Sequence, residues 1–146
     1  MSIKRIYCDI SATTPLDPRI GELLTELNEH IYGNPSSIHR EGQAAKAVVE
    51  KSRRQIANAI NAQPDEIIFT SSGSESNNMV LKGVLCPGDH FITSSYEHPA
   101  ILKVLPYLES QNIDITLIKP DNNGMIQPAE IEKNINENTQ LISIMW

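Results

Sequence analysis

The stretch from residue 66 to residue 78 carries the strongest chemical signal in the sequence. It reads Glu-Ile-Ile-Phe-Thr-Ser-Ser-Gly-Ser-Glu-Ser-Asn-Asn, a short apolar run followed by a loop of small residues that opens a helix. Unpaired backbone N–H groups at a helix start point at one spot, and the helix dipole favours negative charge there. Gly73 allows close approach of the backbone, and serine hydroxyls can add hydrogen bonds, namely those of Ser71, Ser72, Ser74 and Ser76. We therefore predict an anion cup for a phosphate or a carboxylate.

An ordinary serine-rich helix cap is the competing interpretation of this loop. A cap needs one hydroxyl, whereas this loop supplies several hydroxyls beside a glycine, and this favours the anion cup. The loop lacks the Gly-Lys-Ser/Thr ending of a P-loop and the Gly-x-Gly-x-x-Gly fingerprint of dinucleotide-binding proteins. The sequence therefore gives little support to nucleotide binding.

His98 is the second candidate functional residue. Pro99 disfavours a helical conformation for His98, so the imidazole is expected in a loop that follows a strand. In that loop it could stack on a flat ring or move protons near neutral pH. The alternative is a surface histidine in a helix-start turn, with Glu97 only complementing the helix dipole. The residue pattern does not separate these two interpretations.

Alternating strands and helices are expected to bring the two loops together. A helix capped by Asp17 and a long helix over about 43–61 precede a regular alternation of elements. In that alternation we expect strands at 67–70, 90–95, 113–118 and 141–145, and helices at 74–85, 99–110 and 128–136. The pattern predicts an α/β fold with a mainly parallel sheet flanked by helices. Ligands bind beyond the carboxyl ends of such strands, so the loops after Thr70 and Ser95 should be neighbours.

The expected organisation is a single, incomplete α/β domain over residues 1–146. It comprises an N-terminal arm at 1–15, with a short strand-like run at 6–8, a helical segment at 16–62, and a βαβ core at 63–146. The apolar content of 40% indicates a soluble globular protein. A net charge of −6 argues against binding to nucleic acid or to anionic membranes.

Targeting and metal-binding signals are not found in the sequence. No signal peptide or membrane-spanning run is present, so a cytoplasmic location is the default expectation. Cys8 and Cys86 lack the spacing of a disulfide scaffold or a zinc site, and we expect both to be buried free thiols. The four histidines are scattered without metal-ligand spacing, so we predict no metal site.

An ordered set of short motifs resembles the N-terminal part of the NifS/IscS-type cysteine desulfurases, in the class V aminotransferase group of fold-type I pyridoxal-phosphate (PLP) enzymes. Each motif alone is weak, but their order and spacing over nearly the whole chain are specific. The motifs are Asp9, Ala12-Thr13-Thr14-Pro15, Gly33-Asn34-Pro35-Ser36-Ser37-x-His39, Glu66 to Ser71, Glu75-Ser76-Asn77-Asn78 and Glu97-His98-Pro99. Ile10, Ser11 and the Ser72–Ser74 run depart from the family pattern.

The resemblance implies a role for each matching position. Gly73 and Ser74 correspond to the residues that bind the phosphate of PLP. His98 corresponds to the histidine that stacks on the pyridine ring and assists proton transfer. Asn34 and the 12–14 segment would lie near the substrate pocket or the dimer interface.

The activity implied by the resemblance is conversion of L-cysteine to L-alanine. The sulfur passes as a persulfide to an acceptor or scaffold protein, for iron–sulfur cluster or thio-cofactor assembly, and the full-length enzyme would be a homodimer. Family chains are more than twice as long, and the Schiff-base lysine and persulfide-forming cysteine lie beyond the matched part. We therefore expect a truncated, inactive N-terminal fragment. The alternatives are half of a split desulfurase, another class V aminotransferase or lyase, and a non-catalytic phosphate-binding α/β domain.

Overall fold

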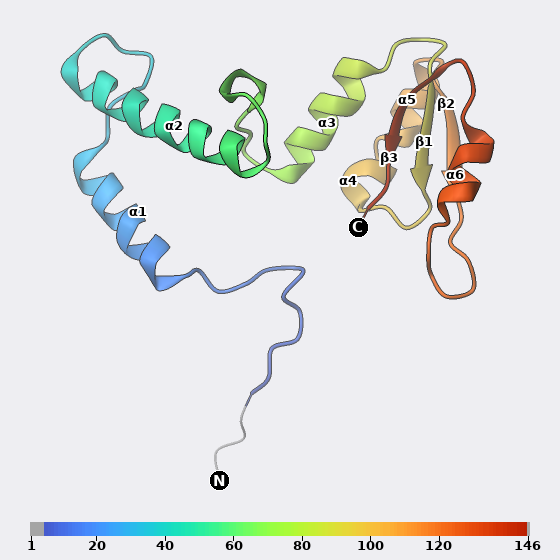
Figure 1. Cartoon of the computed structure of the whole chain (residues 1–146), viewed down its shortest axis with the longest axis horizontal. Coiled ribbons are helices and arrows are strands. Elements are labelled where there is room, and N and C mark those ends of the chain that lie inside the picture. Colours follow the sequence, from blue (N-terminus) through green and yellow to red (C-terminus); the bar gives the residue numbers. More distant parts are fainter. Residues whose placement is uncertain (1–4, 146) are drawn as a thin grey trace. The chain divides into compact units, whose positions relative to one another are not determined.

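The computed structural model describes residues 5–145 (Figure 1). The chain divides between Ile68 and Phe69 into two compact units. Within residues 5–145, no helix is long and apolar enough to cross a membrane. Each unit is considered by itself below.

The N-terminal unit consists of helices α1 (Pro18–His30) and α2 (Arg40–Ala59), followed by the short 3₁₀ helix η1 (Pro64–Glu66). Asp17 caps α1 as predicted, and its carboxylate accepts a 2.9 Å hydrogen bond from the backbone N–H of Arg19. Helix α2 begins earlier than predicted because His39 caps it through its ring Nδ1. Residues 6–8, predicted as a short strand, form no regular element.

The C-terminal unit contains three parallel strands and four helices, as the α/β pattern predicts. Its strand order is β2-β1-β3, so β1 is central and β2 and β3 are the edges. In chain order the elements are α3 (Gly73–Val84), β1 (His90–Ser94), α4 (Pro99–Leu102), α5 (Leu105–Ser110), β2 (Asp114–Ile118), α6 (Pro128–Asn134) and β3 (Thr139–Ser143).

The core of this unit packs against the central strand. All five residues of β1 are buried, and Phe91 is fully inaccessible to solvent. Phe91 lies in a cluster that α3, α4 and α5 supply, with Leu81, Leu85, Ile101, Val104, Leu105, Leu108 and Ile113 as the other buried members. Burial of this apolar area is the main stabilisation of the strand that leads to the His98 loop.

Two predicted elements differ in the structure. Residues 67–70 are extended but lie outside the sheet, because β1 already has β2 and β3 on its two edges. Instead, the Arg53 guanidinium donates to the carbonyl of Ile67. The predicted helix over 99–110 is two helices, since Pro106 has no N–H to bond the carbonyl four residues earlier and α5 starts anew beside it. The two cysteines, predicted to be buried, are both exposed.

Candidate functional site

The start of α3 forms the predicted anion cup, with Ser72 as the capping residue. Ser72 has extended backbone angles, and its hydroxyl accepts a 3.2 Å hydrogen bond from the N–H of Glu75. Its carbonyl accepts the N–H of Ser76 at 3.1 Å. The first turn of the helix is therefore closed by its own cap, and two backbone donors remain ahead of it.

Most of the hydroxyls that the sequence offered to a ligand are used inside the loop. The Ser71 hydroxyl donates to the Glu75 carboxylate at 2.7 Å, and the Ser76 hydroxyl shares a 2.6 Å hydrogen bond with that of Thr70. Since Ser72 is the cap, Ser74 keeps the one hydroxyl of the four without a protein partner among the described residues. The predicted four-hydroxyl cup is therefore narrower than expected.

The donors that remain belong to the two residues predicted to bind phosphate. Within the described part of the chain, the backbone N–H groups of Gly73 and Ser74 donate to no protein group. A Cβ added to Gly73 would meet no atom within 4 Å, so the space in front of these N–H groups is open. Two converging N–H groups and a hydroxyl at a helix start are the donor set that a phosphate accepts.

The carboxylate of Glu75 is the negative charge that already lies at this helix start. Hydrogen bonds from the Ser71 hydroxyl and from the Ser71 N–H, at 2.7 and 2.6 Å, lower the pKa of Glu75 below its ordinary value. The side chain is therefore ionised at neutral pH and holds the loop closed on the side of Ser71.

Acidification should release this closure. A carboxyl group whose pKa is lowered in the folded state stabilises the fold above its unfolded pKa, near 4.5, and loses that contribution as the pH falls through the folded pKa. We expect the Ser71 amide resonance to titrate below pH 4.5 in NMR spectra, and the titration to disappear in Glu75→Gln. A Ser71 amide that titrates at or above 4.5 would contradict the role of Glu75.

His98 caps helix α4 with its ring. Its Nδ1 accepts a 3.0 Å hydrogen bond from the N–H of Ala100, while the imidazole itself is exposed. Accepting this bond requires an unprotonated Nδ1, so the neutral ring carries its proton on Nε2. The histidine is thus a helix-start residue, as one interpretation expected. The cap also fixes the orientation that ring stacking would need.

Glu97, interpreted from the sequence as a helper of the helix dipole, is a buried anchor. Its side chain is 7% exposed, and Oε1 accepts a 2.8 Å bond from the Ser94 hydroxyl and a 2.7 Å bond from the N–H of Met145. These bonds tie the loop after β1 to the chain that follows β3. No local pattern signals this, because Met145 lies 48 residues away.

Helices α3 and α4 pack side by side, and both begin toward the end of the sheet where β1 and β3 end (Figure 1). A hollow of about 210 Å³ lies between them and β3, lined by Asn77, Val80, Leu81, Ile101 and residues 141–143. The elements that carry Gly73, Ser74 and His98 are therefore neighbours. Asn34 and the 12–14 segment belong to the other unit, and their predicted part in a pocket stays a prediction.

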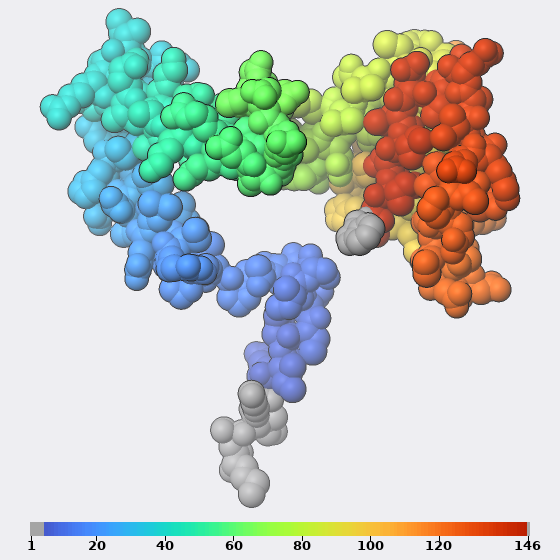
Figure 2. Space-filling view, viewed as in Figure 1, coloured from blue at the N-terminus to red at the C-terminus, as the bar shows by residue number. Residues whose placement is uncertain are grey.

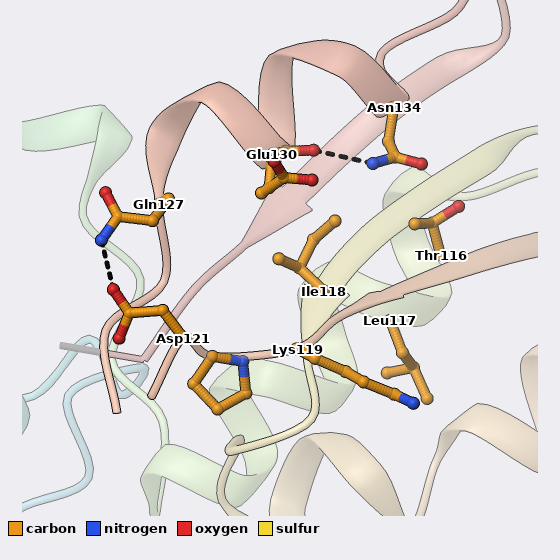
Figure 3. Close-up of a pocket in the computed structure, with 9 residues that line it drawn as sticks. Thr116, Leu117, Ile118, Lys119, Asp121, Gln127, Glu130 and Asn134 are labelled. Carbon is orange, nitrogen blue, oxygen red and sulfur yellow. Dashed lines mark hydrogen bonds between the residues drawn. The ribbon is translucent and has the colours of Figure 1, made fainter. Parts of the chain in front are cut away.

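A separate polar hollow lies beside the β2 edge, with a volume of about 410 Å³ (Figure 3). Asp121 accepts a 2.6 Å bond from Gln127, and the Asn134 amide donates to the carbonyl of Glu130 at 2.7 Å. Hydrogen bonds from the Met125 N–H, Gln127 and Asn123 lower the pKa of Asp121. These polar groups pair largely with one another, so the start of α3 remains the better candidate.

Together, these features define an α/β protein of a specific class. Parallel strands deliver a helix-start anion cup and a positioned histidine to adjacent elements at one end of the sheet, as in α/β proteins that bind phosphorylated ligands. Comparison with known families gives the particular one. The aminotransferase class-V profile matches residues 6–146, and the chain belongs to this family.

Curated relatives are cysteine desulfurases. IscS of Dictyoglomus turgidum is 42% identical over 146 residues, which cover 97% of this chain and 37% of the relative. IscS of Pseudomonas savastanoi pv. phaseolicola is 44% identical over 96% of this chain and 36% of the relative. The chain thus spans little more than a third of the length of these relatives and corresponds to their N-terminal part.

Solved structures show the same fold. A NifS-like protein superimposes with a TM-score of 0.90 at 35% identity, over 97% of this chain and 40% of that protein. SspA in complex with cysteine gives a TM-score of 0.83 at 34% identity, over 94% of this chain and 41% of its own. The fold class predicted from the sequence, the N-terminal portion of a fold-type I large domain, is confirmed.

Proposed function

We propose that this chain is the phosphate- and ring-binding part of a PLP-dependent cysteine desulfurase. The whole enzyme would convert L-cysteine to L-alanine and pass the sulfur as a persulfide to an acceptor protein, for iron–sulfur cluster or thio-cofactor assembly. The open donor set of Gly73 and Ser74 carries this proposal, in a chain 42% identical to a cysteine desulfurase.

The residues at the start of α3 fit the phosphate of PLP. The N–H groups of Gly73 and Ser74 and the Ser74 hydroxyl would hold its oxygens, and the helix dipole favours the charge of a phosphate there. The absence of a side chain at Gly73 leaves room for the group to approach the backbone. Bound PLP would supply an electron sink for chemistry at the amino acid.

His98 would bind the flat ring of the cofactor. The Ala100 N–H holds Nδ1, so the ring keeps one orientation and presents Nε2 as the atom that can release or take up a proton. Glu97 fixes the loop below it through Ser94 and Met145. A stacking residue needs such support, because a freely rotating imidazole would lose orientation and entropy on binding.

The reaction also needs groups that have no match in these 146 residues. No lysine corresponds to the Schiff-base position of the family, and neither Cys8 nor Cys86 corresponds to the persulfide position. We therefore propose that the 146-residue chain alone binds the cofactor without turning over L-cysteine. In the whole enzyme, homodimer formation and a sulfur-acceptor protein complete the proposal.

A binding titration tests the phosphate site. The probe is 4′-deoxypyridoxine 5′-phosphate, whose methyl group replaces the PLP aldehyde and prevents adducts with surface lysines. We expect Ser74→Ala to weaken binding about 10-fold or more, because a hydrogen bond to a charged group contributes about 1.5–3 kcal/mol. Ser76→Ala is the matched control, since the Ser76 hydroxyl bonds Thr70 and not a ligand.

Two further arms make this experiment decisive. The phosphate-free analogue 4-deoxypyridoxine should bind weakly and equally to the parent chain and to Ser74→Ala. With PLP and L-cysteine added, sulfide release should stay at the level of free PLP. Equal affinity of both serine variants would refute the phosphate site, and turnover above the background would refute inactivity of the chain alone.

A further inference from the structure

We propose that the open edge of β3 is a strand-addition surface for a polypeptide that carries the carboxyl-terminal part of a class V aminotransferase fold. The proposal rests on membership in this family and on the sheet, and it is independent of the cysteine desulfurase chemistry. Three features carry it: the composition of the β3 edge, the hollows that flank the strand, and the length of the relatives.

The two edges of the sheet differ in how they are protected. Strand β2 begins at Asp114 and is followed by Lys119 and Pro120, and charges and proline are the usual means of preventing edge-to-edge pairing. Residues 139–145, which form β3 and its continuation, read Thr-Gln-Leu-Ile-Ser-Ile-Met and contain neither a charge nor a proline. The β3 edge is therefore the one suited to accept another strand.

Apolar side chains of this segment are exposed in the C-terminal unit. Ile142 is 41% exposed and Met145 52% exposed. The red carboxyl-terminal segment is open to view at the surface of its unit (Figure 2). A buried parallel strand would have this composition, since such strands are apolar on both faces.

A hollow flanks β3 on the side of α3 and α4. It measures about 210 Å³, and its walls are Val80, Leu81, Ile101 and the strand itself. A second, apolar hollow of about 520 Å³ lies at the end of β3 and beside α6, lined among others by Ile131 and Ile144. Side chains of an added strand alternate between the two faces, so an apolar strand could fill both hollows.

The length of the relatives identifies the occupant. Strand β3 is the last element of this chain, while the NifS-like structure of TM-score 0.90 has 60% of its residues outside the match. A polypeptide with the remaining part of this fold brings apolar strands of the right class, and it would add to a sheet in which all pairs are parallel. A second copy of this chain offers only another β3 edge.

Co-production with a complementary segment tests the proposal. The full 146-residue chain is tagged and expressed with the part of Dictyoglomus turgidum IscS that lies beyond its matched N-terminal 37%. We expect a 1:1 complex in affinity capture and light scattering, with slowed hydrogen exchange at the amides of residues 139–145. Ile142→Lys should reduce capture about 10-fold or more, because it buries a charge in the new sheet.

Leu117→Lys is the matched control. Leu117 is 46% exposed on the other edge strand, so this variant has the same charge and should be captured like the parent. Ile142→Thr, a β-branched residue without charge, should keep most of the binding and separates a lost interface from a lost fold.

The outcomes distinguish the possible occupants. Failure of the parent chain to capture the segment, equal capture of the two lysine variants, or protection of residues 139–145 in a homodimer would each overturn the proposal. None of these outcomes bears on cofactor binding, which the analogue titration measures with the chain alone. Failure of that titration would likewise leave the β3 edge untouched.

Discussion

Glu97→Ala will destabilise the C-terminal unit by about 3 kcal/mol, because it removes a buried carboxylate that accepts two hydrogen bonds. The Ser94 hydroxyl and the Met145 N–H would both lose their partner. Urea unfolding followed by circular dichroism measures the free-energy change. An unfolding free energy equal to that of the parent would contradict the anchoring role of Glu97.

Glu97→Gln is the matched control for this experiment. Its side-chain oxygen can still accept from Ser94 and Met145, so we expect a loss of about 1 kcal/mol. The ¹⁵N resonances of the His98 ring and of the Ala100 amide report on the position of the loop. They should move in Glu97→Ala and stay in place in Glu97→Gln, a difference that a general loss of stability would not produce.

Phe91→Ala will have the largest effect on stability, about 3–5 kcal/mol. Phe91 is fully buried in the central strand and contacts the cluster that three helices supply, so its removal leaves a cavity that these rigid elements cannot close. A small domain has about 5–15 kcal/mol of stability, so this variant should be largely unfolded near room temperature or in mild urea.

Tyr96→Ala controls for the loss of an aromatic residue. Tyr96 belongs to the same unit and is 58% exposed, so its truncation should change the unfolding free energy by less than about 1 kcal/mol. Similar losses in the two variants, measured by urea unfolding, would mean that Phe91 is not the centre of the core. A loss limited to Phe91→Ala would locate the stability of the site in β1.

Local patterns predicted the helix starts well. Asp17 followed by Pro18 and Ser72 followed by Gly73 both begin helices within one residue of the prediction, because a cap depends on groups only two or three residues apart. The prediction was wrong at 67–70 and at 99–110. In the first case strand formation depends on a distant partner, and in the second Pro106 interrupts an otherwise regular helical pattern.

The candidate site was predicted in part. Gly73, Ser74 and His98 lie at the starts of two packed helices, α3 and α4, as the order of elements indicated. The sequence did not reveal that Glu75 occupies Ser71, or that Ser76 pairs with Thr70. Several serines in one loop are equivalent in a sequence, and the folded backbone alone selects which hydroxyl remains open.

The sequence by itself determined the family, the α/β fold and the residues that can bind a phosphate, since these follow from motif order, hydrophobic periodicity and helix capping. The tertiary structure decided three further features: the restriction of the cup to Gly73 and Ser74, the anchoring of Glu97 by Met145, and the open edge of β3. Each depends on groups that compete for partners across many residues. That competition is settled only when strands and helices pack and exclude all but one set of contacts.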